Sequence, residues 1–133
     1  MWQKIGMVPV LLVLFSLSTA CTFTETAFTR TANNAGSAFA AAEVTLTYAH
    51  EGKITYSYAA SSFVNFQSEL SGTGKTLAAQ GTADAYTLRR LLAFYSPAMQ
   101  VIDAPCLSNM CNWPRQIEIL KRASQAFLEA GNS

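Results

Sequence analysis

Apolar residues recur at helical spacing in four stretches of the chain after residue 25. The stretches 26–49 and 53–70 place alanine and aromatic residues three and four positions apart. A third stretch opens at residue 83 or 84, and a fourth opens at Trp113 behind Asn112; both carry leucine and isoleucine at the same spacing. Such spacing is typical of helices that bury one face. The pattern predicts an all-α fold, a small antiparallel bundle of about four helices with short connections.

Residues that favour helix caps, turns or breaks divide these stretches. Gly52 separates the first two helices, and Asp84 and Asn112 are suited to cap the third and fourth. The stretch 71–81 contains three glycines and few large residues, which predicts a loop between helices. Pro97 interrupts the third stretch and predicts a kink or an early end there. The positions expected to face inward are Phe28, Thr31, Ala35, Ala38, Phe39, Ala42, Leu46, Tyr56, Ala59, Phe63, Phe66, Leu70, Leu88, Leu92, Tyr95, Met99, Ile102, Ile117, Leu120, Ser124, Phe127 and Leu128.

An α+β fold with a hairpin around 44–58 is the alternative. Residues 44–48 and 54–58 both alternate apolar with hydroxyl-bearing residues, as hairpin strands do. An isolated two-stranded hairpin is marginal in water, and neither run is separated by Gly or Pro from the helical pattern that it adjoins. The all-α interpretation is therefore favoured.

Residues 1–21 follow a different pattern. Lys4 and the amino terminus are positive, residues 5–17 form an uncharged apolar run, and the small residues Ser18, Thr19 and Ala20 stand directly before Cys21. This order is typical of a secretory signal peptide, and the apolar run is short for a membrane span. The sequence predicts export from the cytoplasm.

The small residues that end at Cys21 resemble the lipobox of bacterial lipoproteins. In that family the cysteine receives a diacylglycerol and becomes the first residue of the mature chain, so the resemblance implies that membrane lipid is a partner through acylated Cys21. The usual leucine three places before the cysteine is Ser18 here, and Leu17 lies one place further back. Ordinary cleavage after Ala20, which gives a secreted soluble protein, is the alternative. The expected organisation is a signal peptide at 1–20, the lipidated cysteine and a tether at 21–30, and the helical bundle domain at 31–133.

The three cysteines are consistent with this assignment. An odd number leaves one unpaired thiol in an exported protein, but acylation of Cys21 leaves only Cys106 and Cys111. Four residues separate these two, enough for a turn that brings the sulfurs together in an oxidising compartment. A metal site lacks further ligands, and a redox C-x-x-C pair has two intervening residues. The sequence predicts a structural disulfide between Cys106 and Cys111.

Charge and motifs exclude several function classes. Of nine basic residues Lys4 belongs to the signal segment, so eight remain against eight acidic residues, which gives no net field for nucleic acid. His50 is the only histidine, and its His50-Glu51 pair lacks the second histidine of a zinc-protease motif because position 54 is Ile54. Gly72 to Thr76 resembles the end of a phosphate-binding loop, but position 69, where the first glycine belongs, is a glutamate. No enzyme activity, metal or cofactor is predicted.

Two functions fit these observations. The preferred one is a membrane-anchored exported lipoprotein, on the outer face of a bacterial membrane, with a non-enzymatic helical interaction domain that engages an envelope protein. The alternative is a small-ligand carrier or sensor that uses an aromatic cluster from Tyr48 to Phe66, with Tyr48, Tyr56 and Tyr58 as ligand-binding residues. The pattern does not specify the partner or the oligomeric state.

Overall fold

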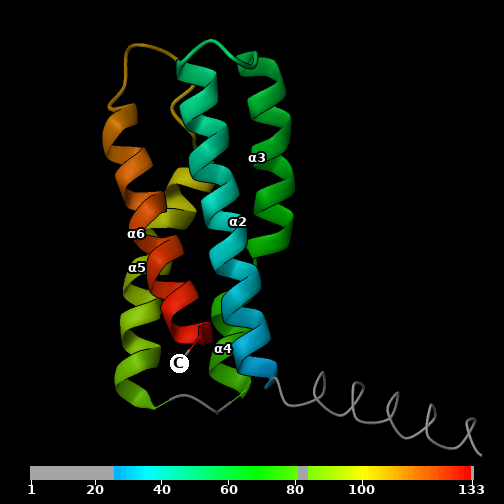
Figure 1. Ribbon diagram of the computed structural model, residues 1–133, viewed down its shortest axis with the longest axis vertical. Coiled ribbons are helices and arrows are strands. Elements are labelled where there is room, and N and C mark those ends of the chain that lie inside the picture. Colours follow the sequence, from blue (N-terminus) through cyan, green and yellow to red (C-terminus); the bar gives the residue numbers. More distant parts are fainter. Residues whose placement is uncertain (1–25, 81–83, 133) are drawn as a thin grey trace, which may run out of the picture.

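Helices account for most of residues 26–80 and 84–132, the part of the chain that the computed structural model describes. The helices in that part are α2 (Ala27–His50), α3 (Tyr56–Leu70), α4 (Thr73–Gln80), α5 (Ala85–Asp103) and α6 (Trp113–Asn132). Helix α2 runs along the bundle, α3 and α4 return as one broken arm, α5 runs in the direction of α2, and α6 returns (Figure 1). The predicted all-α antiparallel bundle is confirmed.

Four of the helices begin behind a side-chain oxygen that accepts a backbone N–H three positions further on. These capping residues are Thr26, Thr55, Asp84 and Asn112, and the hydrogen bonds are 3.1, 3.0, 2.7 and 3.2 Å long. Such caps satisfy N–H groups that the first helical turn leaves without a partner. The predicted caps Asp84 and Asn112 are confirmed.

The stretch 44–58 is not a hairpin. Helix α2 continues through His50, a turn with Gly52 at φ +74° follows, and α3 starts at Tyr56. The hydroxyl groups that suggested strand alternation turn back onto the helix instead, since those of Thr45 and Thr47 donate to carbonyls four residues earlier at 2.8 and 2.9 Å.

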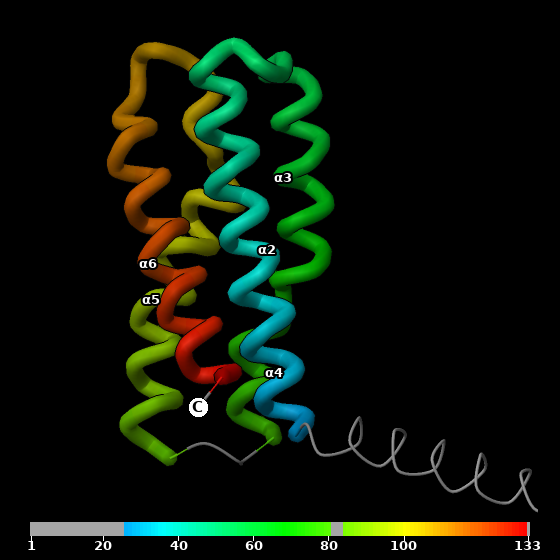
Figure 2. Tube along the Cα trace, in the orientation of Figure 1, coloured from blue at the N-terminus to red at the C-terminus, as the bar shows by residue number. Residues whose placement is uncertain are grey.

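The prediction of a loop at 71–81 is wrong for residues 73–80. Gly72, at φ +87°, ends the first part of the arm, and α4 starts at the next residue (Figure 2). Leu77 of α4 is buried in the core, and the Gln80 amide donates to the Thr31 hydroxyl of α2 at 3.0 Å. Tertiary packing therefore makes a helix of a stretch whose glycines and polar residues do not favour one.

Two further boundaries differ from the sequence expectations. Helix α5 includes Pro97 and continues to Asp103, so the proline does not end it. Helix α2 begins at Ala27, so residues 27–30 of the expected tether form its first turn.

The core is centred on Phe39 of α2. Its ring lies 6.3 Å from that of Tyr95 in α5 and 5.6 Å from that of Phe127 in α6, so three helices meet through aromatic rings. Ala35 and Ala38 of the same helix are also buried. The alanines let neighbouring helices approach α2 closely, as its sequence indicates.

Helices α2 and α6 approach each other closely. A Cβ atom added at Gly36 would lie 2.7 Å from Cγ of Leu128 and 3.0 Å from its backbone nitrogen. Further along the same pair of helices, Asn33 lies over Gly131 with no room for a β-carbon. The absence of a side chain at Gly36 and at Gly131 therefore allows α2 and α6 to pack closely.

Most of the predicted inward positions are buried. Tyr56 is instead exposed, at 38%, because it is the first residue of α3, beside the turn, and Thr31, Phe66, Ile117 and Leu128 are only half-buried. The buried face of α5 is also shifted: its buried residues are Leu91, Ala98, Val101 and Ile102, whereas Leu88, Tyr95 and Met99 are half-buried against the core and Leu92 is half-buried. The cause is that α5 packs against α6 on one side and against the α3–α4 arm on another, so that a wider face is covered. No helix in the described part of the chain has the length and apolar character needed to cross a membrane.

Candidate functional site

The three tyrosines predicted to bind a ligand lie around the turn between α2 and α3. Tyr48, Tyr56 and Tyr58 are all exposed, with 43%, 38% and 64% of their surfaces accessible. Tyr48 lies beneath the Lys53 ammonium, 4.9 Å from its ring centre. A hydrogen bond to Glu51 and the charge of that carboxylate raise the pKa of Lys53. The tyrosines occupy the outer surface at this end of the bundle.

His50 joins this turn to the loop between α5 and α6. Its Nε2 lies 2.6 Å from the carbonyl oxygen of Cys106, which can only accept, so Nε2 carries the proton. The ring stacks on Trp113 with centres 4.4 Å apart and planes 10° apart, and the Tyr56 hydroxyl lies 3.5 Å from Nδ1. These contacts give the single histidine a structural role at the end of the bundle.

Cys106 and Cys111 form a disulfide in the same loop. Their Cα atoms are 5.9 Å apart, and Cys106 is buried while Cys111 is exposed. The Gln116 side chain fastens the loop from α6, accepting from the Cys106 N–H at 2.7 Å and donating to the Ala104 carbonyl at 3.2 Å. The predicted pairing is therefore present in the structure. Cys21 lies outside the described residues.

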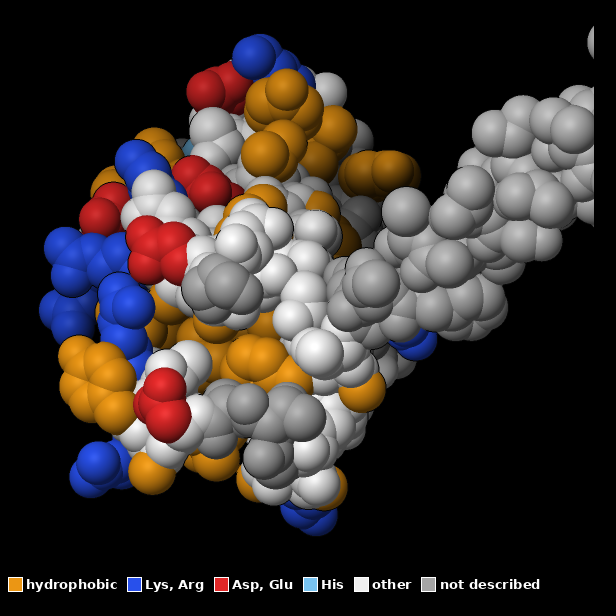
Figure 3. Space-filling model, turned by 60° about the horizontal axis from the view of Figure 1, so that its bottom comes forward, with side chains coloured by type: hydrophobic (Ala, Val, Ile, Leu, Met, Phe, Trp, Pro, Cys, Tyr) orange, Lys and Arg blue, Asp and Glu red, His pale blue; other side chains and the backbone are white. Residues whose placement is uncertain are grey.

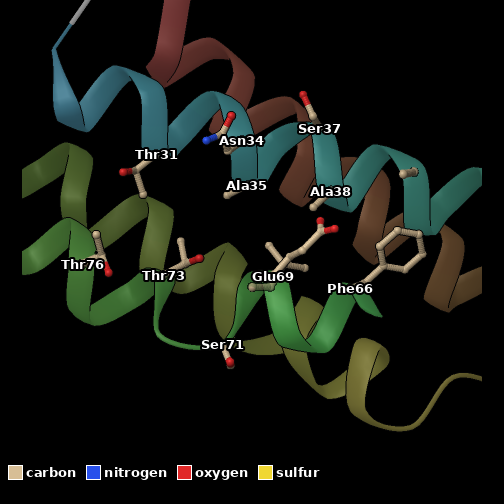
Figure 4. Close-up of a pocket in the computed structure, with 12 residues that line it drawn as sticks. Thr31, Asn34, Ala35, Ser37, Ala38, Phe66, Glu69, Ser71, Thr73 and Thr76 are labelled. Carbon is tan, nitrogen blue, oxygen red and sulfur yellow. The ribbon is translucent and has the colours of Figure 1, made fainter. Parts of the chain in front are cut away.

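A groove of about 690 Å³ lies between α2 and the α3–α4 arm (Figure 4). Its lining combines small side chains with hydroxyl, amide and carboxylate groups and one aromatic ring. The lining residues are Thr31, Asn34, Ala35, Ser37, Ala38, Ala41, Phe66, Glu69, Leu70, Ser71, Thr73 and Thr76. A volume of this size is within the range of small-molecule sites.

The break in the α3–α4 arm shapes this groove. Because the chain changes direction at Gly72, the last turn of α3 and the first turn of α4 both border the space beside α2. The Gln80–Thr31 hydrogen bond ties α4 to α2 at one end, and Phe66 stands at the other end. Glu69 extends its carboxylate across the space toward Ala38 of α2 (Figure 4).

The surface of the bundle carries mixed charges. Seen toward the end at which α2 begins, acidic and basic side chains alternate on one side of the molecule (Figure 3). Exposed ion pairs of the bundle join Arg90 to Glu129 at 3.7 Å and Arg122 to Glu118 at 3.0 Å. Such pairs contribute little stability, but alternating signs leave no strong field of one charge.

Residues 26–80 and 84–132 contain no group of three or more His, Cys, Asp or Glu side chains that could hold a metal ion. Within the groove, Glu69 is the only acidic residue of the lining. One carboxylate among hydroxyl groups is a poor ligand set for a divalent cation, which takes six or more oxygen ligands when it is calcium.

The chain matches no protein-family model, no curated protein and no solved structure.

Sequence reasoning did not find the groove, because it treated residues 71–81 as a loop. Phe66 belongs to the predicted aromatic cluster and does line the space, but Glu69 and Thr73 carried no expectation of binding. The signal in the sequence is the stripe of small polar residues Asn34 and Ser37, which lies beside the alanine stripe of α2. Small uncharged polar residues at this spacing indicate a helix face that neither packs into the apolar core nor forms a charged surface.

Proposed function

We propose that this chain is an exported lipoprotein, held on the outer face of a bacterial membrane by acylated Cys21, whose helical bundle is a non-enzymatic binding module. The observation that carries the proposal is the order of residues 1–21, a positive start, an apolar run and three small residues before a cysteine. Acylation supplies the membrane affinity, since each buried methylene contributes about 0.8 kcal/mol and two or more chains hold a protein stably.

The cysteine pairing supports this proposal. With Cys106 and Cys111 joined, Cys21 is the one remaining cysteine of the three in the sequence. Disulfides are typical of exported proteins, and modification of Cys21 removes the thiol that would otherwise stay unpaired.

The binding role is supported by what the bundle offers. His50, the only conventional base near neutral pH in this chain, is held by the Cys106 carbonyl and by Trp113. The groove beside α2, by contrast, has the volume and the polar groups of a binding site. A module of this kind would engage its partner or ligand at the membrane surface.

Fractionation of cells that express the wild type and Cys21→Ser tests the anchor. The wild type should be found with the membranes and Cys21→Ser in the soluble exported fraction or still carrying residues 1–20, while the control Thr22→Ser should behave as the wild type. Mass spectrometry of the mature amino terminus should show an acylated Cys21. A wild type found wholly soluble, with an unmodified Cys21, would show ordinary cleavage after Ala20 and contradict the proposal.

A further inference from the structure

The groove between α2 and the α3–α4 arm carries a single charge. Glu69 extends into it from the last turn of α3, and no lysine or arginine is among its lining residues. No hydrogen bond or ion pair engages the Glu69 side chain within the described part of the chain. The groove is therefore negative, and it favours a cation or a neutral ligand over an anion.

Thr73 adds a hydroxyl group to the lining of the groove. It is only 8% exposed, it lines the groove from the first position of α4, and Figure 4 shows its side chain directed toward α2. Its hydroxyl makes no hydrogen bond within residues 26–80 and 84–132. Solvent reaches the hydroxyl oxygen, which can accept a hydrogen bond from a ligand that enters the groove.

Phe66 lies one helical turn before Glu69, so its ring and the carboxylate border the groove from the same side of α3. An aromatic face attracts cations through its quadrupole, and a carboxylate attracts them through its charge. Across the groove, Ala35 and Ala38 are only 3% and 7% exposed, so the alanine surface open to an alkyl group is that of Ala41 in the same lining.

We infer that this groove binds a small organic cation through its primary ammonium group. The Glu69 carboxylate neutralises the ammonium, the Thr73 hydroxyl accepts one of its N–H groups, and the Phe66 ring flanks it. The carbon chain of the ligand lies over Ala41 on the α2 side of the groove. This inference rests on the proposed function only in treating the bundle as a binding module, and it does not require the lipid anchor.

Titration of the exported full chain, ¹⁵N-labelled and held in a maltoside detergent that carries no ammonium group, tests the inference. The probe is n-butylammonium, and 1-butanol and butyrate are the neutral and anionic controls. Butylammonium should cause saturable shifts of backbone amide signals in residues 31–41 and 66–76. Neither control should reproduce those shifts at the same concentration.

Two substitutions assign the contacts. Glu69→Gln keeps the shape of the side chain and should weaken butylammonium binding about fivefold, since it removes an ion pair near the surface. Thr73→Val should weaken it by a similar factor, because the methyl group cannot accept a hydrogen bond. The matched control is Glu43→Gln, which removes a charge from α2 outside the groove and should leave the dissociation constant unchanged. The helical circular dichroism of each variant reports whether it has folded.

Several outcomes overturn the inference. Equal binding of 1-butanol would make the groove a site for neutral molecules, and shifts confined to the signals of Tyr48, Tyr56 and Tyr58 would assign binding to the tyrosines. An unchanged affinity in Glu69→Gln, or the absence of a saturable shift, would equally refute it. None of these results depends on fractionation, so the anchor and the ammonium site can fail separately.

Discussion

Substitution of Gly36 by alanine tests the close contact between α2 and α6. The added Cβ would stand 2.7 Å from Cγ of Leu128 and 3.0 Å from its backbone nitrogen, whereas attractive contacts between such atoms lie near 3.5 to 4.0 Å. A side-chain rotamer change cannot move the backbone nitrogen, so α2 and α6 must separate locally.

The expected size of the effect is the difference between two opposing terms. Overpacking of a tight interface costs about 1 to 3 kcal/mol, and the better helix propensity of alanine returns about 1 kcal/mol. Since a backbone atom is involved, we expect a net loss of about 1.5 kcal/mol in the free energy of unfolding of Gly36→Ala. For a domain of about 100 residues this lowers the melting temperature by about 7 °C.

Gly74→Ala is the matched control, because Gly74 also lies in a helix with an ordinary φ. Its added Cβ would meet only the ends of side chains, Cδ2 of Leu92 at 3.3 Å and Cε1 of Tyr95 at 3.4 Å. These atoms can yield by a few tenths of an ångström, so its melting temperature should stay within about 2 °C of the wild type.

Thermal unfolding followed by circular dichroism at 222 nm measures both variants. A Gly36→Ala protein as stable as the wild type would refute the close approach of α2 and α6. A double-mutant cycle with Leu128→Ala adds a specific readout, since removal of the clashing side chain should make the two substitutions less destabilising together than their sum.

Three other predictions concern the Cys106–Cys111 disulfide, Tyr95 and Asp84. The exported protein should show no free thiol from Cys106 and Cys111 until it is reduced, as measured by thiol titration. Replacement of both by serine should lower the free energy of unfolding by at most about 2 kcal/mol, because the closed loop is short. Circular dichroism should show that helix content is retained, and loss of the helix signal on reduction would contradict this prediction. Burial raises the pKa of Tyr95, whose hydroxyl donates to the Leu70 carbonyl at 2.7 Å. The stability that Tyr95 contributes should therefore be fully present below the ordinary tyrosine pKa and be lost as pH rises through the higher folded value. Tyr95→Phe should be less stable at neutral pH and lose that alkaline component in unfolding measured between pH 8 and 12; an unchanged pH profile would refute the assignment. Hydrogen bonds from the first turn of α5 lower the pKa of Asp84. The stability that this carboxylate contributes should therefore be present above the ordinary aspartate pKa and be lost as pH falls through the lower folded value. Asp84→Ala should lower the melting temperature at pH 7 but not at pH 2, and a loss of equal size at both would show another cause.

The parts of the fold that could be predicted depend on local chemistry. Helices α2, α5 and α6 have apolar residues at regular spacing and begin behind side chains that cap them, such as Asp84 and Asn112. Both signals lie within a few residues of sequence, so they can be recognised without knowledge of neighbouring helices. Helix α4 has neither, and only Leu77 packing into the core and Gln80 bonding to Thr31 account for it.

The site could be predicted less well, because a groove belongs to two segments at once. Tyr48 and Tyr58 belong to an aromatic-rich stretch, yet they lie on either side of the α2–α3 turn with 43% and 64% of their surfaces exposed. Glu69 and Thr73 face a space only because Gly72 redirects the chain beside α2. Sequence periodicity assigns a residue to a face of its own helix, but the register between helices decides whether that face is covered.

The antiparallel arrangement also sets the distance of each feature from the end at which α2 begins. The 24 residues of α2 rise about 36 Å from Ala27 to His50, and the disulfide loop lies at the far end while α6 returns to the near one (Figure 1). If Cys21 is anchored in lipid as proposed and the bundle stands upright, a label at Met110, which is 95% exposed, would lie about the length of α2 above the lipid surface. A label after α6 would lie close to that surface, so the two positions would report the tilt of the molecule on the membrane.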